Sequence, residues 1–241
     1  MDRTTRHGLA RALSRRGVCS RTQAARWIAA GRVRVDGIIV HEPEFPTVES
    51  SRIEVDGRPV VASRRRYVAL NKPRGLVTTT TDDRGRDTVY RCFDGAGLPW
   101  LGPVGRLDKA SEGLLLFCND PAWAAAVTDP ARGTLKTYHV QVDRWVDERQ
   151  LSQFESGVVV DGVLLRAARA RLLRTGTRNA WLEIVLDEGR NRQIRRLLAA
   201  FDIGVLRLVR VAIGPLLLGD LPKGGWRELD ASEVDALATR G

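Results

Sequence analysis

Apolar residues recur at helical spacing near the start of the chain. Leu9 and Leu13 are four positions apart, and Ala24, Trp27 and Ile28 follow the i, i+3, i+4 pattern of a helix with one buried face. A glycine separates the two repeats, a serine precedes the second and another glycine follows it, and these residues are typical of helix boundaries. The pattern predicts two short helices within residues 8–30.

The next segment has the pattern of short strands. Residues 33–35 and 38–40 flank Asp36-Gly37, a dipeptide that favours a tight hairpin turn. Another strand is expected at residues 53–55, after a loop that contains proline. We therefore expect a compact helix-helix-hairpin domain in residues 1–62.

Residues 63–241 predict a second, larger domain. An arginine-rich stretch precedes an apolar strand at 67–70, and further strands are expected at 114–118 and 136–142. Ile194, Leu197, Leu198 and Phe201 repeat at i, i+3, i+4, i+7 and predict a helix. Because strands and helices mix without a regular βαβ alternation, we expect an α+β fold with a mixed, mainly antiparallel sheet flanked by helices.

The charge of the chain indicates a polyanionic partner. Lysine and arginine number 39 against 29 aspartate and glutamate residues, for a formal net charge of +10. Within residues 1–40, nine arginines face two aspartates, so most of the excess lies at this end. Arg11, Arg15 and Arg21 lie away from the predicted apolar stripes, and this free basic face favours nucleic-acid binding over a merely solvated surface.

The rest of the composition excludes several classes of protein. Cys19, Cys92 and Cys118 are odd in number, far apart and without a C-x-x-C pair, so neither a disulfide framework nor a zinc site is expected. The chain begins without an apolar leader and has no run of 18 apolar residues. We expect a cytoplasmic protein that binds no membrane.

Three segments carry candidate chemistry. Asp108 lies in a glycine-bounded loop, residues 105–113, directly before an apolar strand. Tyr138 alternates with apolar residues along strand 136–142, and Arg192 and Arg195 adjoin the apolar face of the predicted helix. Taken singly, the aspartate could be an ordinary turn residue and the tyrosine a packing residue.

Five motifs, in family order along the chain, resemble those of the RsuA/RluB-type pseudouridine synthases. They are LNKPRGLVTTTTDDRGRDTV, GRLDKASEGLLLFCND, KTYHVQV, EGRNRQIRRLL and RVAIGPLLLGDLPKGGWREL, within residues 66–229. The preceding string SRRGVCSRTQAARWIAAGRVRVDG resembles the S-four RNA-binding domain, so that the resemblance covers nearly the whole chain. Ala110 and Cys118 depart modestly from the family pattern and leave the subgroup open.

The resemblance implies an enzyme that isomerises one uridine of ribosomal RNA to pseudouridine. Asp108 would be the catalytic carboxylate, attacking the ribose anomeric carbon or ring carbon six, with Arg195 as its cationic partner. Tyr138 would stack on the base and remove the proton at carbon five. The uridine must be extruded from structured RNA, and Arg106 could fill the vacated space. Because the reaction is an isomerisation, neither a cofactor nor a metal is implied.

Further cations are expected to contact RNA. Lys72 and Arg74, and likewise Arg84 and Arg86, combine with loop-forming residues and could hold phosphates. The expected RNA-binding residues are Arg106, Lys72, Arg74, Arg192, Arg11, Arg15 and Arg21. The expected partner is ribosomal RNA or a ribosomal subunit precursor, transfer RNA remains open as a substrate, and the protein is expected to be a monomer.

Two other functions compete with this one. The same basic surfaces could serve a ribosome-assembly factor or RNA chaperone that does no chemistry, although the residues of the catalytic set favour an enzyme. An unrelated hydrolase would need Ser111 with a histidine base. His7, His41 and His139 are the three histidines of the chain, and none lies in a nucleophile-elbow motif.

Overall fold

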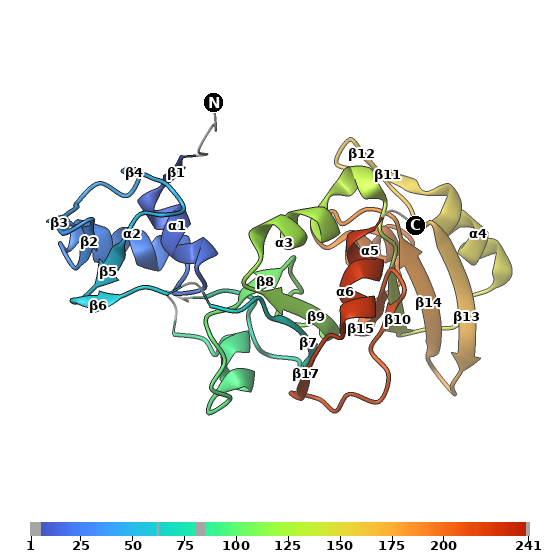
Figure 1. Ribbon diagram of the computed structural model, residues 1–241. Helices are drawn as coiled ribbons and strands as arrows, with labels where there is room; N and C mark the ends of the chain where they lie inside the picture. Colours follow the sequence, from blue (N-terminus) through green and yellow to red (C-terminus); the bar gives the residue numbers. More distant parts are fainter. Residues whose placement is uncertain (1–5, 62, 81–84, 240–241) are drawn as a thin grey trace. The chain divides into compact units, whose positions relative to one another are not determined.

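The computed structural model describes residues 6–61, 63–80 and 85–239 (Figure 1). The chain divides into two compact units. One consists of the residues up to Tyr67 with Asp94–Gly102 and Phe117–Ala122, and the other of Val68–Phe93, Pro103–Leu116 and the residues from Trp123 onward. Ala62, at the expected domain boundary, and Arg84, an expected phosphate contact, lie outside the described residues.

The first unit combines two helices with short strands. The helices are α1 (Leu9–Arg15) and α2 (Arg21–Ala29). Strands pair in the order β3-β2-β5-β6, and β1 pairs with β4. The strands are β1 (His7–Gly8), β2 (Val33–Val35), β3 (Ile38–Ile39), β4 (Pro46–Thr47), β5 (Ile53–Val55) and β6 (Arg58–Pro59).

The predicted helices and hairpin of this unit are confirmed. Ser20 caps α2, since its hydroxyl accepts a hydrogen bond from the Gln23 amide at 3.1 Å. Asp36 and Gly37 adopt positive φ in the turn between β2 and β3, as the tight hairpin requires. The predicted apolar stripes lie inside a core made of Leu9, Ala10, Leu13, Cys19, Ala24, Ile28, Val33, Val35, Val40 and Ile53.

The second unit is built on a mixed sheet of nine strands. Its main order is β13-β14-β10-β15-β9-β7-β17, while β16 pairs with β15 and β8 with β9. Strand β9 runs parallel to β15, whereas β13–β14, β14–β10 and β10–β15 are antiparallel. The α+β fold predicted for this part of the chain is thus confirmed. The sheet strands are β7 (Tyr67–Lys72), β8 (Gly102–Val104), β9 (Glu112–Cys118), β10 (Lys136–Val142), β13 (Arg169–Thr175), β14 (Ala180–Leu186), β15 (Val205–Ile213), β16 (Leu216–Leu217) and β17 (Trp226–Glu228).

Helices and short connections complete this unit. They are η1 (Val89–Phe93), α3 (Pro121–Thr128), η2 (Pro130–Arg132), α4 (Glu148–Ser156), the hairpin β11 (Val158–Val160) and β12 (Val163–Leu165), α5 (Gln193–Ala199) and α6 (Ala231–Ala238). The predicted helix is shorter than its apolar repeat, because Phe201 follows its last turn and packs edge-on against Phe154, with ring centroids 5.2 Å apart. Within the described residues, no helix is both long and apolar enough to cross a membrane.

One face of the sheet packs against α4 and α5. Strand β14 alternates between buried and half-buried residues, and its buried set includes Leu182 and Ile184. These join Val140 of β10, Phe154 of α4 and Leu197 of α5 in one apolar cluster. The alternate residues of β14 and β10 therefore point away from these helices.

Candidate active site

Asp108 lies on a tight loop between β8 and β9. The loop folds back on itself, since the Ser111 amide donates to the Asp108 carbonyl at 3.0 Å. Two of its carbonyls are bound by residues 75–78: the Gly75 amide donates to the Lys109 carbonyl at 2.8 Å, and the Thr78 hydroxyl donates to the Leu107 carbonyl at 2.8 Å. The carboxylate is thus presented by a loop held on both sides, and its side chain is 34% exposed.

Gly113, just after this loop, is required by the close approach of β9 and β15. Its φ is +100°, a conformation that other residues rarely adopt. A Cβ atom at this position would lie 2.2 Å from the Arg210 carbonyl oxygen. The sequence pattern of glycines around Asp108 therefore reflects strand packing as well as loop formation.

Lys72 supports the loop from inside the protein. The side chain is fully buried, and its ammonium group donates to the carbonyls of Pro73 at 3.0 Å and Ser111 at 2.8 Å. Burial lowers the pKa of Lys72 to about 8, although Glu112 and Asp108 oppose this shift. The phosphate contact expected for Lys72 does not fit this placement, because the ammonium group has no exposure to solvent and is engaged by backbone oxygens.

The cation that contacts Asp108 is Arg192. Its Nη1 lies 3.9 Å from Asp108 Oδ2. Arg192 precedes the first residue of α5 and has a left-handed backbone, with φ 49° and ψ 32°. Every other non-glycine residue with positive φ in the described part of the chain is an aspartate, whose short polar side chain tolerates this region better. A strained residue that contacts the candidate nucleophile is a feature of functional sites.

Arg195, which was expected to pair with Asp108, bonds to backbone instead. Its terminal nitrogens donate to the carbonyls of Val205 at 3.2 Å and Ala110 at 3.3 Å. Burial lowers the pKa of Arg195, and Arg192 lowers it further, while Asp108 opposes the shift. Arg195 is thus within electrostatic reach of the carboxylate, but it buttresses the Asp108 loop rather than forming the ion pair.

Tyr138 lies on the sheet face that packs against α5. It is half-buried and packs against the cluster that contains Leu197 of α5. In the strand register it lies between Ile184 on one side and Arg210 on the other. Its hydroxyl forms no hydrogen bond with the described residues, which leaves it available to a ligand.

Arg210 was missed by sequence reasoning. It is 6% exposed, its Nε donates to the Leu114 carbonyl at 2.7 Å, and its Nη2 is buried without a partner among the described groups. A buried guanidinium with no carboxylate partner carries a desolvation cost, and the unpaired Nη2 makes Arg210 a candidate for a functional role. The only signal in the sequence was an arginine at a buried position of a mainly apolar strand that also contains Arg207.

The remaining expected RNA contacts lie on the surface. Arg74 and Arg106 are exposed, and Arg74 is close enough to lower the pKa of Arg195. In the first unit Arg11, Arg15 and Arg21 are exposed on α1 and α2. The neighbouring Arg16 differs, because its guanidinium donates to the carbonyls of Glu49 and Ser51 and joins the end of α1 to the loop between β4 and β5.

Comparisons with known proteins agree with this organisation. Residues 66–200 match the family model described as RNA pseudouridylate synthase, and residues 8–53 match the S4 domain model. A solved structure described as a pseudouridylate synthase aligns with a TM-score of 0.67 and 28% identity, over 96% of this chain and 99% of that one.

Similar proteins are found over nearly the full length. An uncharacterized RNA pseudouridine synthase of Aquifex aeolicus is 37% identical over 93% of this chain and 91% of its own length. The ribosomal large subunit pseudouridine synthase B of Haemophilus influenzae is 35% identical over 95% of this chain and 66% of its own length. The chain therefore belongs to the RNA pseudouridylate synthase family.

Proposed function

We propose that this protein converts a specific uridine of ribosomal RNA to pseudouridine, with Asp108 as the catalytic carboxylate. The observation that carries the proposal is the ion pair between Asp108 and Arg192, on a loop that Lys72 and Arg195 also hold. Two similar proteins, from Haemophilus influenzae and Vibrio vulnificus, are named ribosomal large subunit pseudouridine synthases. Their names support ribosomal RNA as the substrate.

The chemistry proposed for the site begins with the Asp108 carboxylate. It attacks the ribose anomeric carbon or carbon six of the uracil, and the bond between the anomeric carbon and N1 breaks. The base turns, a bond forms between carbon five and the anomeric carbon, and the bond to Asp108 breaks to free the carboxylate. Carbon five then loses its proton and N1 gains one, so the product is an isomer of uridine. Arg192 and Arg195 place positive charge beside the reacting groups, where a fixed cation stabilises developing negative charge most effectively.

Tyr138 is proposed to stack on the base and remove its proton, and Arg106 to fill the space that the extruded uridine leaves. The half-buried ring of Tyr138 offers a stacking surface, and its unbonded hydroxyl is suited to take the proton from carbon five. Extruding a uridine from structured RNA costs roughly a few kcal/mol. Arg106 is exposed two residues before Asp108, so its side chain can occupy the space that the uridine leaves.

We further propose a division of labour between residues 1–62, which bind RNA, and residues 63–241, which carry the chemistry. The S4 match within residues 8–53 and the exposed Arg11, Arg15 and Arg21 support the first assignment. Arg74 and Arg192 would hold phosphates next to the reacting uridine. We propose that the protein acts in the cytoplasm as a monomer and without a cofactor.

The proposal is tested by mapping pseudouridine. Wild-type protein and Asp108→Asn are incubated with unmodified ribosomal RNA transcripts and with ribosomal subunits, and carbodiimide-dependent reverse-transcription stops are compared. A stop made by wild type alone supports both reaction and nucleophile. If wild type bound RNA tightly and made no stop on any substrate, the assembly-factor function would replace the enzyme.

A further inference from the structure

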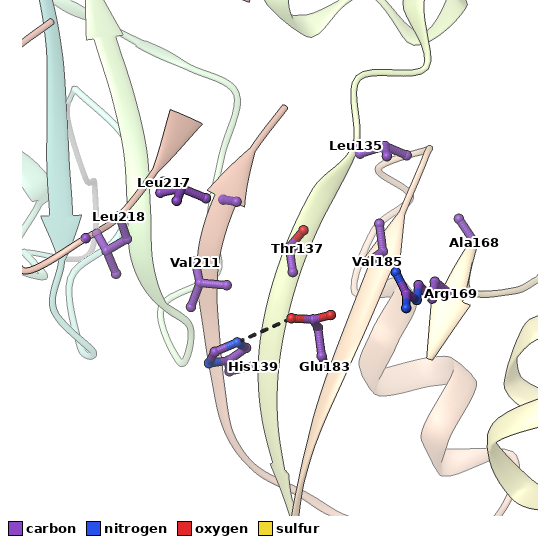
Figure 2. A pocket seen from close by; sticks show the side chains of 12 residues that line it. Leu135, Thr137, His139, Ala168, Arg169, Glu183, Val185, Val211, Leu217 and Leu218 are labelled. Atoms are coloured by element: carbon purple, nitrogen blue, oxygen red, sulfur yellow. Dashed lines mark ion pairs between the residues drawn. The ribbon is translucent and has the colours of Figure 1, made fainter. Parts of the chain in front are cut away.

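The catalytic sheet has a second face that the proposed reaction does not use. We define the outer face as the side chains of β13, β14, β10 and β15 that point away from α4 and α5. These residues are partly or largely exposed, and Figure 2 views the part of this face around His139 and Glu183. Its polar and aromatic members are Arg169, Arg171, Arg174, Trp181, Glu183, Thr137, His139, Gln141 and Arg207.

Arginines on the outer face are only partly neutralised. Arg171 pairs with Glu183, with 2.6 Å between Nε and Oε1. His139 Nε2 is 3.7 Å from the same carboxylate. Arg169 and Arg174 are exposed, and neither has a carboxylate within 4.0 Å among the described residues.

A second charge cluster adjoins the first. Glu112 of β9 is buried, and its carboxylate pairs with Arg207 at 3.1 Å and with Lys223. Burial alone would raise the pKa of Glu112, but these two cations outweigh it and lower the pKa. Across both clusters, the five cations Arg169, Arg171, Arg174, Arg207 and Lys223 face the two carboxylates of Glu112 and Glu183, an excess of three positive charges.

The aromatic ring of Trp181 is contacted by the exposed Arg174 and by the half-buried Arg207. The Arg174 guanidinium carbon is 5.1 Å from the centroid of the Trp181 ring, and that of Arg207 is 5.5 Å away. Trp181 is half-buried, so part of its indole surface stays open. Aromatic rings flanked by guanidinium groups on an open sheet are the surfaces on which unpaired nucleic-acid bases stack.

The outer face also contains an apolar hollow of about 810 Å³. Figure 2 shows Val185 and Val211 on its floor, Leu217 at one side and Arg169 at the other, next to the His139–Glu183 pair. The hollow therefore adjoins the arginines, and a base can be placed against apolar side chains while its phosphate meets a guanidinium.

We propose that the outer face is a second RNA-binding surface, which holds an unpaired segment of the RNA substrate against Trp181 and the hollow, with phosphates on Arg169 and Arg174. The proposal rests on the proposed function only in naming ribosomal RNA as the polymer. The positive charge of this face favours RNA over an apolar protein segment as the occupant. An apolar segment would bury Arg169 and Arg174 without an anion, and burying an unpaired charge costs free energy.

The test compares two variants with the same change in net charge. Arg169→Ser/Arg174→Ser removes two positive charges from the outer face, and Arg149→Glu makes the same change on exposed α4, which covers the other face. The probe is a labelled single-stranded RNA of about 12 nucleotides, a length that open RNA-binding surfaces can span. Its affinity is measured at several salt concentrations.

For the double variant we expect weaker binding and a salt dependence whose logarithmic slope is smaller by about 1.4, or about 0.7 for each lost phosphate contact on a single strand. Arg149→Glu should leave this slope at the wild-type value. Equal slopes and affinities for wild type and the double variant would overturn the proposal, provided that thermal melts show both to be folded.

Modification assays separate this proposal from the proposed function. On a short hairpin with the mapped uridine, the double variant should match wild type, whereas on long ribosomal RNA its KM should rise. If the double variant bound naked RNA normally and lost activity only on assembled subunits, a ribosomal protein would occupy the outer face instead. If wild type modified no RNA, the proposed function would fail, while the binding slopes would still decide this proposal.

Discussion

Arg192 is the residue at which conformation and chemistry conflict most clearly. A non-glycine residue in the left-handed region carries about 1–2 kcal/mol of strain. We predict that Arg192→Gly unfolds at a higher urea concentration than wild type, with a gain of about 1 kcal/mol, because glycine relieves the strain. The same variant should lose about tenfold in kcat, which corresponds to about 1.4 kcal/mol of transition-state stabilisation lost with the guanidinium beside Asp108.

Asp202→Gly is the matched control for this prediction. Asp202 also has positive φ, at 56°, but it is exposed and lies beyond the end of α5. Its replacement should stabilise the protein without lowering the rate of pseudouridine formation. Loss of activity in both variants would mean that flexibility at the glycine, and not the missing guanidinium, is responsible.

The buried ammonium group of Lys72 should make the stability of the protein depend on pH. Its pKa is about 8 in the folded protein and 10.5 in the unfolded chain, so the unfolded state binds more protons between these values. The free energy of unfolding of wild type should therefore rise from pH 8 to 10.5 relative to that of Lys72→Met. The full shift corresponds to about 3 kcal/mol. Urea titrations at pH 7.5 and pH 10 measure the difference, and parallel profiles would contradict the buried ammonium.

Residue-scale features were the hardest to predict from sequence. The motif order identified Asp108, Tyr138 and Arg195 as candidates, because residue types at fixed spacing can be recognised from the sequence alone. The arginine that contacts the carboxylate, Arg192, has a left-handed backbone, and the burial of Lys72 depends on β9 lying beside β7. Neither has a local signal in the chain.

At the scale of elements, the close contact between β9 and β15 limits which residues position 113 can hold. We predict that Gly113→Ala destabilises the protein by about 3 kcal/mol or more, because its Cβ would meet the Arg210 backbone, which cannot move as a flexible side chain does. Gly219→Ala is the control: its φ is +57° with open space around it, so only about 1 kcal/mol of strain is expected. Chemical unfolding of both variants distinguishes close approach from strain alone.

Elements with local signals were predicted well. Strand 136–142 and the helices of residues 8–30 follow from apolar periodicity and from Ser20, which caps α2. Pairing was not predictable in the same way. Strand β9 lies beside β15, with Glu112 next to Val209, and no turn signal connects residues so far apart in the chain.

At the scale of the whole molecule, separate units carry the proposed RNA-binding helices and the proposed chemistry. We predict that Arg11→Ser/Arg15→Ser/Arg21→Ser raises KM for long RNA. The logarithmic slope of RNA affinity against salt concentration should be smaller by about 2 to 3, because each duplex phosphate contact contributes about 0.9. The rate at saturating RNA should stay at the wild-type value. Single-turnover kinetics separate the two quantities.

A triple variant in and next to the strands of the same unit provides the control. Arg34, Arg52 and Arg58 are exposed there, and their replacement by serine removes the same charge. Equal losses in both triple variants would mean that total charge, and not the helical face, attracts RNA.

The pairing of β9 with β15 also has a consequence for the order in which the protein matures. The Asp108 loop takes its support from Arg195 and from a strand that starts at Val205, whereas the apolar core around α1, α2 and the β2–β3 hairpin uses only residues between Leu9 and Ile53. Contacts between distant residues form late, because the chain must lose the entropy of closing a long loop before those contacts can stabilise it. A growing chain therefore forms its proposed RNA-binding surface well before its catalytic loop is held in place, so it can bind RNA before it can modify it.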